Sequence, residues 1–242
     1  MTSYAISHIG NVRIENEDSF YCSDGKESMY VVADWMGGHI GGKIASKTAV
    51  DVLTKFFNAN KLNSANEIKN VLLEIQNQYN IKISQNQDLV DMGSTLTATF
   101  IKNNIVDLIH VGDSRCYLLS GNNFSQITND HTLANKLYLN GKYTKLDKNL
   151  DKTKHILLRA VVAKGNIDID HLKFMLYKGD MLLLCTDGLT GYLKDGELKS
   201  VLLEDSTLQD KANKLLNLAL DRGGKDNITL IIVKNEEEDY DR

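Results

Sequence analysis

Four apolar segments of this 242-residue chain are bounded by an aspartate, and this regularity constrains the fold more than any other feature. Asp34, Asp113 and Asp187 each follow such a segment, and Asp226 precedes one. Buried strands hold their ends rigidly, so carboxylates at neighbouring strand ends can converge on one point. Converging carboxylates repel one another unless cations are present, and oxygen ligands select hard ions such as Mg²⁺ or Mn²⁺. A single Asp after a strand is more typical of a turn, so the prediction depends on the whole set.

Composition excludes several classes of protein. Apolar residues make up 42% and charged residues 25%, which is typical of a globular chain. A net charge of −4 gives no general attraction to nucleic acid or to anionic lipid. Cys22, Cys116 and Cys185 lack the spacing of a zinc site or a disulfide framework. With no secretory signal pattern and no apolar run near the roughly 20 residues of a membrane helix, we expect a cytoplasmic monomer.

Apolar runs and alternation predict the strands. They cover Tyr4 to Ile9, Met29 to Ala33, Thr95 to Ile101, Ile105 to Val111, Cys116 to Leu119, Met181 to Thr186 and Ile228 to Val233. Thr95, Thr97 and Thr99 alternate with apolar residues, which indicates a strand with one buried face and one face that meets something polar. The pairs Asn103-Asn104 and Gly121-Asn122 predict tight hairpins, so we expect an antiparallel meander in the middle of the chain.

Three amphipathic segments predict helices. One runs from Lys43 to Phe57, a second follows the capping box Ser64 to Glu67, and a third runs from Thr207 to Asp221. Antiparallel strands with long helices between them predict an α+β sandwich, with helices outside two sheets. No linker or repeat interrupts the chain, so we expect a single domain over residues 1–235 and a frayed acidic tail over 236–242.

A cluster of charged residues near the N-terminus indicates a class of substrate. Arg13 lies close in sequence to Glu15, Glu17 and Asp18. Read by itself, this is a polar surface turn. Arginine also presents a planar fork that suits phosphate oxygens, and beside a metal cluster it suggests a phosphate ester substrate.

Seven motifs in order then resemble the protein phosphatase 2C family, in its bacterial form. They are Gly10 with Arg13-x-x-Asn16-Glu17-Asp18, Val32-Ala33-Asp34-x-Met36-Gly37-Gly38-His39, Gly93-Ser94-Thr95, Gly112-Asp113-Ser114-Arg115, Asp130-His131, Asp187-Gly188 and Asp226-Asn227-x-Thr229. The resemblance extends from about residue 4 to residue 233. It implies a four-layer α-β-β-α sandwich, two mostly antiparallel sheets flanked by helices, with a metal centre at one end. It also implies a substrate-contacting flap over about residues 132–165.

The resemblance implies roles for individual residues. Asp34 would bridge two metal ions, with Asp187 and Asp226 completing the first site. The carbonyl of Trp35 would bind the second ion, with Glu17 and Asp18 acting through water. Asp113 and Asp187 would hold a third ion, and Arg13 would bind the phosphoryl oxygens. Asn227 would support Asp226 rather than bind metal.

Two departures from the family pattern leave alternatives open. Trp35 stands where the family has glycine, and a tryptophan cannot adopt a positive φ without strain. Trp35 is compatible with three outcomes: an active enzyme with an altered pocket, a weakened or metal-poor enzyme, and a catalytically inactive protein that binds phosphoproteins. Met36 cannot donate a proton, so His39 is a candidate acid for the leaving group; a role in ordering the loop or binding substrate is equally open.

The implied reaction is hydrolysis of phosphoserine and phosphothreonine in proteins, with two or three Mn²⁺ or Mg²⁺ ions activating water. The protein partners would be phosphorylated substrates and a bacterial-type serine/threonine kinase that the enzyme opposes. A catalytically inactive phosphoprotein-binding protein is one alternative. A phosphoesterase for small molecules is another.

Overall fold

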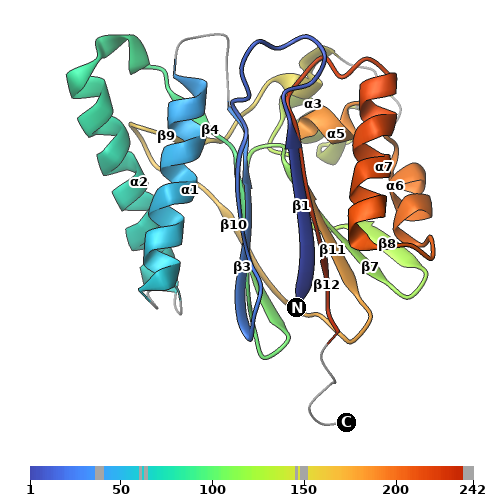
Figure 1. Cartoon of the computed structure of the whole chain (residues 1–242). Coiled ribbons are helices and arrows are strands. Elements are labelled where there is room, and N and C mark those ends of the chain that lie inside the picture. Colours follow the sequence, from blue (N-terminus) through green and yellow to red (C-terminus); the bar gives the residue numbers. More distant parts are fainter. Residues whose placement is uncertain (36–40, 60–61, 63–64, 145–146, 148–151, 237–242) are drawn as a thin grey trace.

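A computed structural model describes residues 1–35, 41–59, 62, 65–144, 147 and 152–236. Its elements form four layers, with two sheets packed face to face and helices outside each of them (Figure 1). This arrangement confirms the predicted α-β-β-α sandwich. In the described part of the chain, no helix combines the length and apolar character needed to cross a bilayer.

The first sheet has the strand order β1-β12-β11-β7-β8. Its strands are β1 (Thr2–His8), β12 (Ile228–Lys234), β11 (Met181–Cys185), β7 (Arg115–Ser120) and β8 (Asn123–Gln126). Three helices cover its outer face, namely α5 (Asp187–Thr190), α6 (Asp195–Leu202) and α7 (Leu208–Asp221). The predicted third helix is α7, and its N-cap is Thr207, whose side chain accepts a hydrogen bond from the Asp210 N–H.

The second sheet has the order β10-β6-β5-β3-β2. Its strands are β10 (Asp170–Met175), β6 (Ile105–Val111), β5 (Leu96–Lys102), β3 (Glu27–Ala33) and β2 (Ser19–Ser23). Helices α1 (Gly42–Asn58) and α2 (Ala65–Gln85) cover it. The capping box predicted for α2 includes Ser64, which lies outside the described residues.

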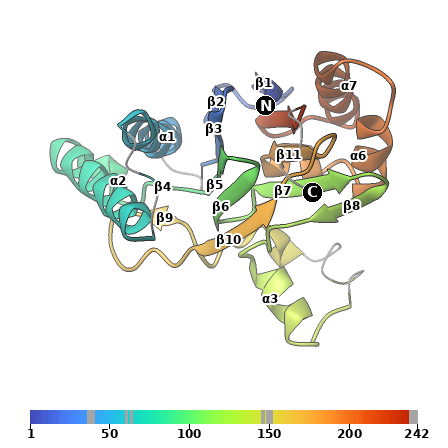
Figure 2. The ribbon, with the colours of Figure 1, turned by 90° about the horizontal axis from the view of Figure 1, so that it is seen from below.

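Shorter elements complete the chain. They are the turn η1 (Gln87–Leu89), the paired strands β4 (Gly93–Ser94) and β9 (Val161–Val162), helix α3 (Leu133–Leu139) and the turn η2 (Lys152–His155). Helix α3 lies beside the four layers rather than within them (Figure 2). It belongs to the segment predicted as a flap.

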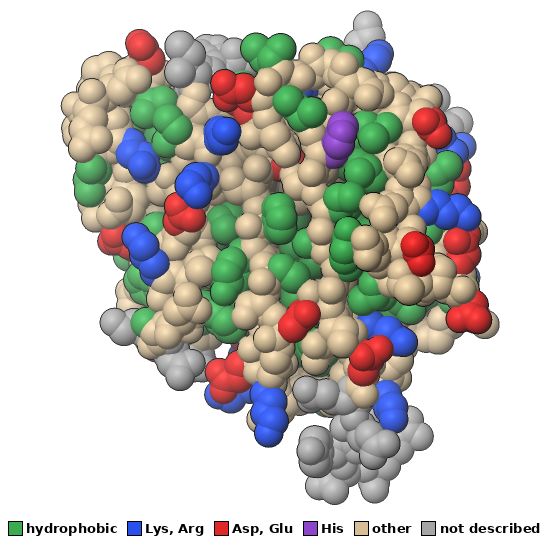
Figure 3. All heavy atoms as spheres, in the orientation of Figure 1, with side chains coloured by type: hydrophobic (Ala, Val, Ile, Leu, Met, Phe, Trp, Pro, Cys, Tyr) green, Lys and Arg blue, Asp and Glu red, His purple; other side chains and the backbone are tan. Residues whose placement is uncertain are grey.

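Three apolar clusters hold the layers together. Leu53 and Ile75 belong to the cluster between the helices α1 and α2 and the second sheet, and Leu183 and Leu215 to the cluster under α5 to α7. The third cluster lies between the sheets and includes Val32. On the face seen in Figure 3, hydrophobic side chains gather between the two helical layers and charged side chains toward the outside.

The predicted single meander is wrong, because its two hairpins lie in different sheets. Strands β5 and β6 pair through the turn Asn103-Asn104, whose φ angles of 51° and 61° match a hairpin turn. Strands β7 and β8 pair in the other sheet. The connection between the hairpins passes through Gly112 at φ 109°, which redirects the chain from one sheet to the other.

The strand with alternating threonines has a face that meets a polar partner, as its pattern predicted, and that face is buried. Both faces of β5 are buried, and Thr97 and Thr99 are fully inaccessible to solvent. Thr97 Oγ1 lies 2.9 Å from the Nδ1 atom of His110 on the neighbouring strand, so the polar partner of this face is a buried histidine. His110 Nε2 lies 3.0 Å from the carbonyl oxygen of Asn129, to which it donates.

Burial of His110 makes the stability of the protein depend on pH. Burial, and then the proximity of His131, lower the pKa of His110 to about 4, below the 6.5 of an exposed histidine. Between pH 6.5 and pH 4, His110 binds a proton in the unfolded chain but stays neutral in the folded chain. The free energy of unfolding therefore falls as pH drops through this range. The loss is about 3 kcal/mol.

The comparison that isolates this contribution is between the natural chain and His110→Gln. We expect the difference in unfolding free energy between them, measured by urea titration, to shrink by about that amount between pH 7 and pH 4. The difference cancels the other titrating groups that the two proteins share, including Asp130 and Asp170 near the ring. A constant difference across this range would contradict the expectation.

Candidate metal centre

One edge of the sandwich collects the strand ends that carry the aspartates. Ser19 pairs with Ala33 and Leu96 pairs with Val111, so the start of β2 and the ends of β3 and β6 lie at the same edge. In the other sheet, Cys185 pairs with Leu230, which brings the end of β11 to the start of β12. This is the upper edge in Figure 1.

A pocket of about 90 Å³ lies at this edge. It is lined by Arg13, Glu17, Asp34, Trp35, Asp113, His155, Leu157, Asp187, Asp226 and Asn227. The structure therefore brings together the residues predicted for the site, with two exceptions. Asp18 lies beneath the pocket, and His39 lies outside the described residues.

Asp34 lines the pocket, and Asp18 is buried beneath it. Asp18 Oδ2 accepts hydrogen bonds from Thr229 Oγ1 (2.6 Å) and Thr186 Oγ1 (2.9 Å). Its buried Oδ1 has no hydrogen-bond partner within the described residues. Burial, together with the charge of Asp187, raises the pKa of Asp18 to about 7. Asp18 and its carboxyl neighbours Asp34 and Asp187 cannot all be ionised at low cost without a cation.

The other aspartates of the pocket also repel one another. Burial, and then the charges of Asp18, Asp187 and Asp113, raise the pKa of Asp34 well above its ordinary value. Burial and the charge of Asp187 raise the pKa of Asp113 in the same direction. The set of oxygen donors, with one buried oxygen left without a donor, fits hard divalent cations.

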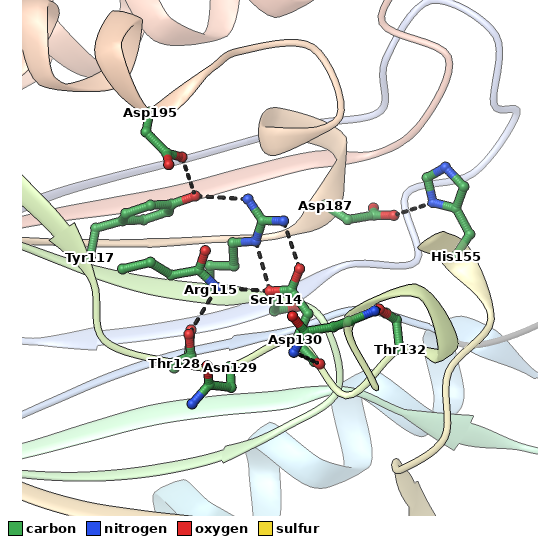
Figure 4. Close-up of polar contacts among 12 residues, drawn as sticks. Ser114, Arg115, Tyr117, Thr128, Asn129, Asp130, Thr132, His155, Asp187 and Asp195 are labelled. Carbon is green, nitrogen blue, oxygen red and sulfur yellow. Dashed lines mark hydrogen bonds and ion pairs between the residues drawn. The ribbon is translucent and has the colours of Figure 1, made fainter. Parts of the chain in front are cut away.

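Nitrogen atoms of two side chains lie beside two of the carboxylates. Arg13 donates to Asp226 Oδ2 at 2.8 Å, and this contact is the main reason that the pKa of Arg13 is raised. His155 Nδ1 lies 3.5 Å from Asp187 Oδ2 (Figure 4). Among the described residues, no three His, Cys, Asp or Glu side chains are placed so that together they could hold a metal ion. The carboxylates therefore need water or small rotations to complete an ion's coordination shell.

Asn227 holds the N-terminal loop against the pocket. Its Nδ2 donates to the carbonyls of Ile9 and Glu15, and its Oδ1 accepts from the Glu17 N–H, each at 2.8 to 2.9 Å. These three bonds position the loop that carries Arg13. The side chain of Asn227 thus supports the N-terminal loop, whereas its backbone N–H donates to Asp226 Oδ1 at 2.9 Å. Asn227 also lines the pocket, and its support of Asp226 stays a prediction.

Trp35 has an ordinary backbone conformation. Within the described residues, only Asn103 and Asn104 among the non-glycine residues have a positive φ. Trp35 therefore lacks the backbone strain that a positive φ would cause. Its backbone forms an antiparallel bridge with Ser94. Its indole lies against Gly42, where an added Cβ would fall 2.3 Å from the ring. A glycine in α1 thus makes room for the tryptophan.

The motif Gly93-Ser94-Thr95 fixes the backbone of Asp34. The carbonyl of Asp34 accepts from Thr95 N (2.8 Å) and Ser94 Oγ (2.9 Å), and the Asp34 N–H donates to Thr95 Oγ1 (2.9 Å). Three hydrogen bonds leave the Asp34 carboxylate as the part of the residue directed at the pocket.

The loop that carries Asp113 is held by hydrogen bonds to the segment after β8. Arg115 forms two hydrogen bonds with the carboxylate of Asp130, at 2.8 and 2.7 Å (Figure 4). The next residue, His131, donates its N–H to the Gly112 carbonyl at 2.8 Å and accepts the Gly112 N–H through Nδ1 at 3.2 Å. His131 thus fastens the segment after β8 to the loop of Asp113.

Comparison with known proteins identifies the family. Residues 7–223 match the family model of protein phosphatase 2C. The chain belongs to this family. It is therefore a metal-dependent serine/threonine protein phosphatase, as its sequence predicted.

Three relatives illustrate the match to this family. The chain is 34% identical to protein phosphatase PhpP of Streptococcus pneumoniae, over 97% of each chain. The structure of Stp1 from Staphylococcus aureus is 31% identical and matches with a TM-score of 0.90, over 97% of this chain and 95% of that one. The catalytic domain of PstP in complex with two manganese ions is 29% identical, with a TM-score of 0.86 over 96% and 97%.

Two residues of the phosphatase pocket were not singled out from the sequence. His155, at the end of η2, and Leu157, just after it, both reach the pocket. Both fall within the predicted flap, but no motif or spacing marked them individually. Their proximity to Asp187 depends on how residues 131–133 fold back on residues 155–158.

Proposed function

We propose that this pocket hydrolyses phosphoserine and phosphothreonine in proteins, with two or three Mn²⁺ or Mg²⁺ ions at its base. The observation that carries the proposal is the convergence of Asp34, Asp113, Asp187 and Asp226 from separate strand ends beside one arginine. The bound ions supply a water molecule of lowered pKa that can attack phosphorus near neutral pH.

The chain's own residues hold the ions in the following proposed arrangement. Asp34 would bridge two ions, and Asp187 and Asp226 would complete the first position. The Trp35 carbonyl, with Glu17 and Asp18 acting through water, would serve the second. Asp113 and Asp187 would serve a third. The raised pKa values of Asp34 and Asp113 support this assignment, because cations are what would let these buried carboxylates stay ionised together.

Arg13 binds the phosphoryl oxygens in this proposal. Its guanidinium pairs with Asp226 at 2.8 Å and is partly exposed at the pocket mouth. Once Asp226 serves as a metal ligand, the planar fork can turn to the substrate and stabilise charge that develops on the peripheral oxygens. His39 is the proposed proton donor or substrate contact.

The test is release of phosphate from serine- and threonine-phosphorylated peptides, measured with Mn²⁺ and with a chelator. We expect turnover with Mn²⁺ and none with the chelator. Small phosphate esters at the same concentration provide the comparison. Efficient turnover of esters with none of peptides would contradict the protein substrate, and peptide binding without turnover would favour the inactive alternative.

The Trp35→Gly variant tests whether the tryptophan impairs the enzyme. The carbonyl proposed as a ligand is present in both proteins, and Trp35 has no strained φ angle to relieve. We therefore expect Mn²⁺-dependent turnover of the two proteins to agree within about tenfold, or 1.4 kcal/mol in activation free energy. A much larger gain in the glycine variant would indicate that the natural chain is a weakened enzyme.

The cellular setting proposed here is that of a monomeric cytoplasmic phosphatase that opposes a serine/threonine kinase. Residues 1–235 would form one catalytic domain, with a substrate-contacting flap over about 132–165. Phosphoproteins that accumulate when the gene is deleted, and decline when the kinase is also deleted, would identify the shared targets. Sedimentation measures the oligomeric state.

A further inference from the structure

His155 occupies a position at the metal centre that no sequence motif assigned. It is the last residue of η2, its side chain is about half exposed, and it lines the pocket together with Asp113 and Asp187. In Figure 4 its ring points from the flap segment toward the carboxylate of Asp187.

We propose that His155 supplies an imidazole nitrogen to the ion held by Asp113 and Asp187, and that this position therefore prefers transition-metal ions to Mg²⁺. The inference rests on the metal centre proposed above and deepens it. It assigns a ligand from the flap and a class of ion to the third metal position.

The separation of the two atoms suits a shared ion. His155 Nδ1 and Asp187 Oδ2 are 3.5 Å apart, longer than the roughly 2.7–2.9 Å of a charge-assisted hydrogen bond. Two ligands that each lie about 2.1 Å from one ion are about 3.0 Å apart at a right angle and about 3.4 Å apart at a tetrahedral angle. Small movements of either side chain therefore suffice for both to bind the same ion.

Backbone hydrogen bonds fix His155 relative to Asp113. The Leu133 N–H donates to the carbonyl of Ile156 (2.9 Å), and the Leu158 N–H donates to the carbonyl of His131 (2.8 Å). His131 is in turn hydrogen-bonded to Gly112, the residue before Asp113. The backbone that follows His155 is thus tied to the loop that carries the other proposed ligand.

The chemistry of the donor explains the expected preference. Asp113 and Asp187 offer oxygen atoms only, and oxygen donors suit Mg²⁺ and Mn²⁺. An imidazole nitrogen favours ions such as Co²⁺, Ni²⁺ and Zn²⁺ and adds no further negative charge. If His155 were only a cation paired with Asp187, it would oppose the binding of every metal ion.

The two roles predict opposite results for His155→Ala. Loss of a ligand weakens the binding of Co²⁺ far more than that of Mg²⁺, whereas loss of a competing cation strengthens both. His155→Gln sharpens the distinction, because its amide can still donate to Asp187 but offers no ring nitrogen. The matched control is His171→Ala, since His171 also pairs with an aspartate, Asp107, but lies outside the pocket.

The experiment is calorimetric titration of the full chain with Co²⁺ and with Mg²⁺, supported by the visible absorption spectrum of bound Co²⁺. We expect both His155 variants to raise the Kd of the weakest Co²⁺ site by about tenfold or more and the Mg²⁺ Kd by less than about threefold. The Co²⁺ spectrum should change in these variants and not in His171→Ala.

Unchanged or tighter Co²⁺ binding by His155→Ala, with binding by the natural chain intact, would overturn this proposal alone. Failure of the natural chain to bind either ion, with Asp34→Asn behaving identically, would overturn the metal centre and this proposal together. Rescue of Co²⁺ affinity by His155→Gln would also overturn it, because a hydrogen-bonding role would then suffice.

Discussion

Replacing Asp34 with asparagine is expected to lower the Mn²⁺-dependent turnover of phosphopeptides by roughly 10³-fold or more, equivalent to about 4 kcal/mol of activation free energy. Asp34 lines the pocket, near Asp18, Asp187 and Asp113. It is the carboxylate proposed to bridge two ions. Asparagine keeps the shape of the side chain but lacks the charge that would hold both cations.

The same substitution should stabilise the metal-free protein. The pKa of Asp34 is higher in the folded chain than in the unfolded chain, so ionising this carboxyl group opposes folding. The free energy of unfolding therefore falls as pH rises from the unfolded pKa to the folded pKa. At pH 7 an uncharged asparagine removes that cost. We expect a higher melting temperature than that of the natural chain in a chelator, and a smaller gain on adding Mn²⁺.

Asp51→Asn is the matched control for Asp34→Asn. Asp51 lies on the exposed side of α1, where it pairs only loosely with Lys47 at 3.7 Å. This variant should retain activity, stability and the response to Mn²⁺. Retention of activity by Asp34→Asn would contradict the assignment of the centre, as would a metal-free protein that is less stable than the natural chain.

Gly188→Ala is expected to destabilise the fold by about 3 kcal/mol, which corresponds to a fall in melting temperature of roughly 6–12 °C. A Cβ at this position would lie 1.9 Å from the backbone oxygen of Asn227. The obstacle is backbone at the start of β12, so the strand or α5 must move. Either shift displaces Asp187 or Asp226, and we expect Mn²⁺ affinity to fall with stability.

Gly196→Ala is the control for Gly188→Ala, since Gly196 also lies in a helix and an added Cβ would meet no atom within 4 Å. It should be neutral or stabilising by up to about 1 kcal/mol, because alanine favours helix more than glycine does. Thermal unfolding monitored by circular dichroism compares the two variants. Equal melting temperatures would show that the two helices tolerate a Cβ equally.

Local pattern was sufficient to predict much of the sandwich. Strand β6 occurs with the predicted bounds, and α1 and α7 begin and end within one residue of theirs. The sequence did not indicate β10 or β2, because these strands at the sheet edges mix polar and apolar residues. Nor did it separate the β5–β6 hairpin from the β7–β8 hairpin, because the turn at Gly112 gives no local sign of which sheet the chain enters next.

The sequence by itself determined which residues could carry the chemistry, since a strand that ends in aspartate is visible in the order of residues alone. Only the tertiary structure decided which other groups face those carboxylates. Arg13 pairs with Asp226, 213 residues away, and His155 faces Asp187 from the end of η2. Such contacts depend on how separate loops pack at one edge of two sheets, and that packing is set by long-range burial and hydrogen bonds that no local pattern encodes.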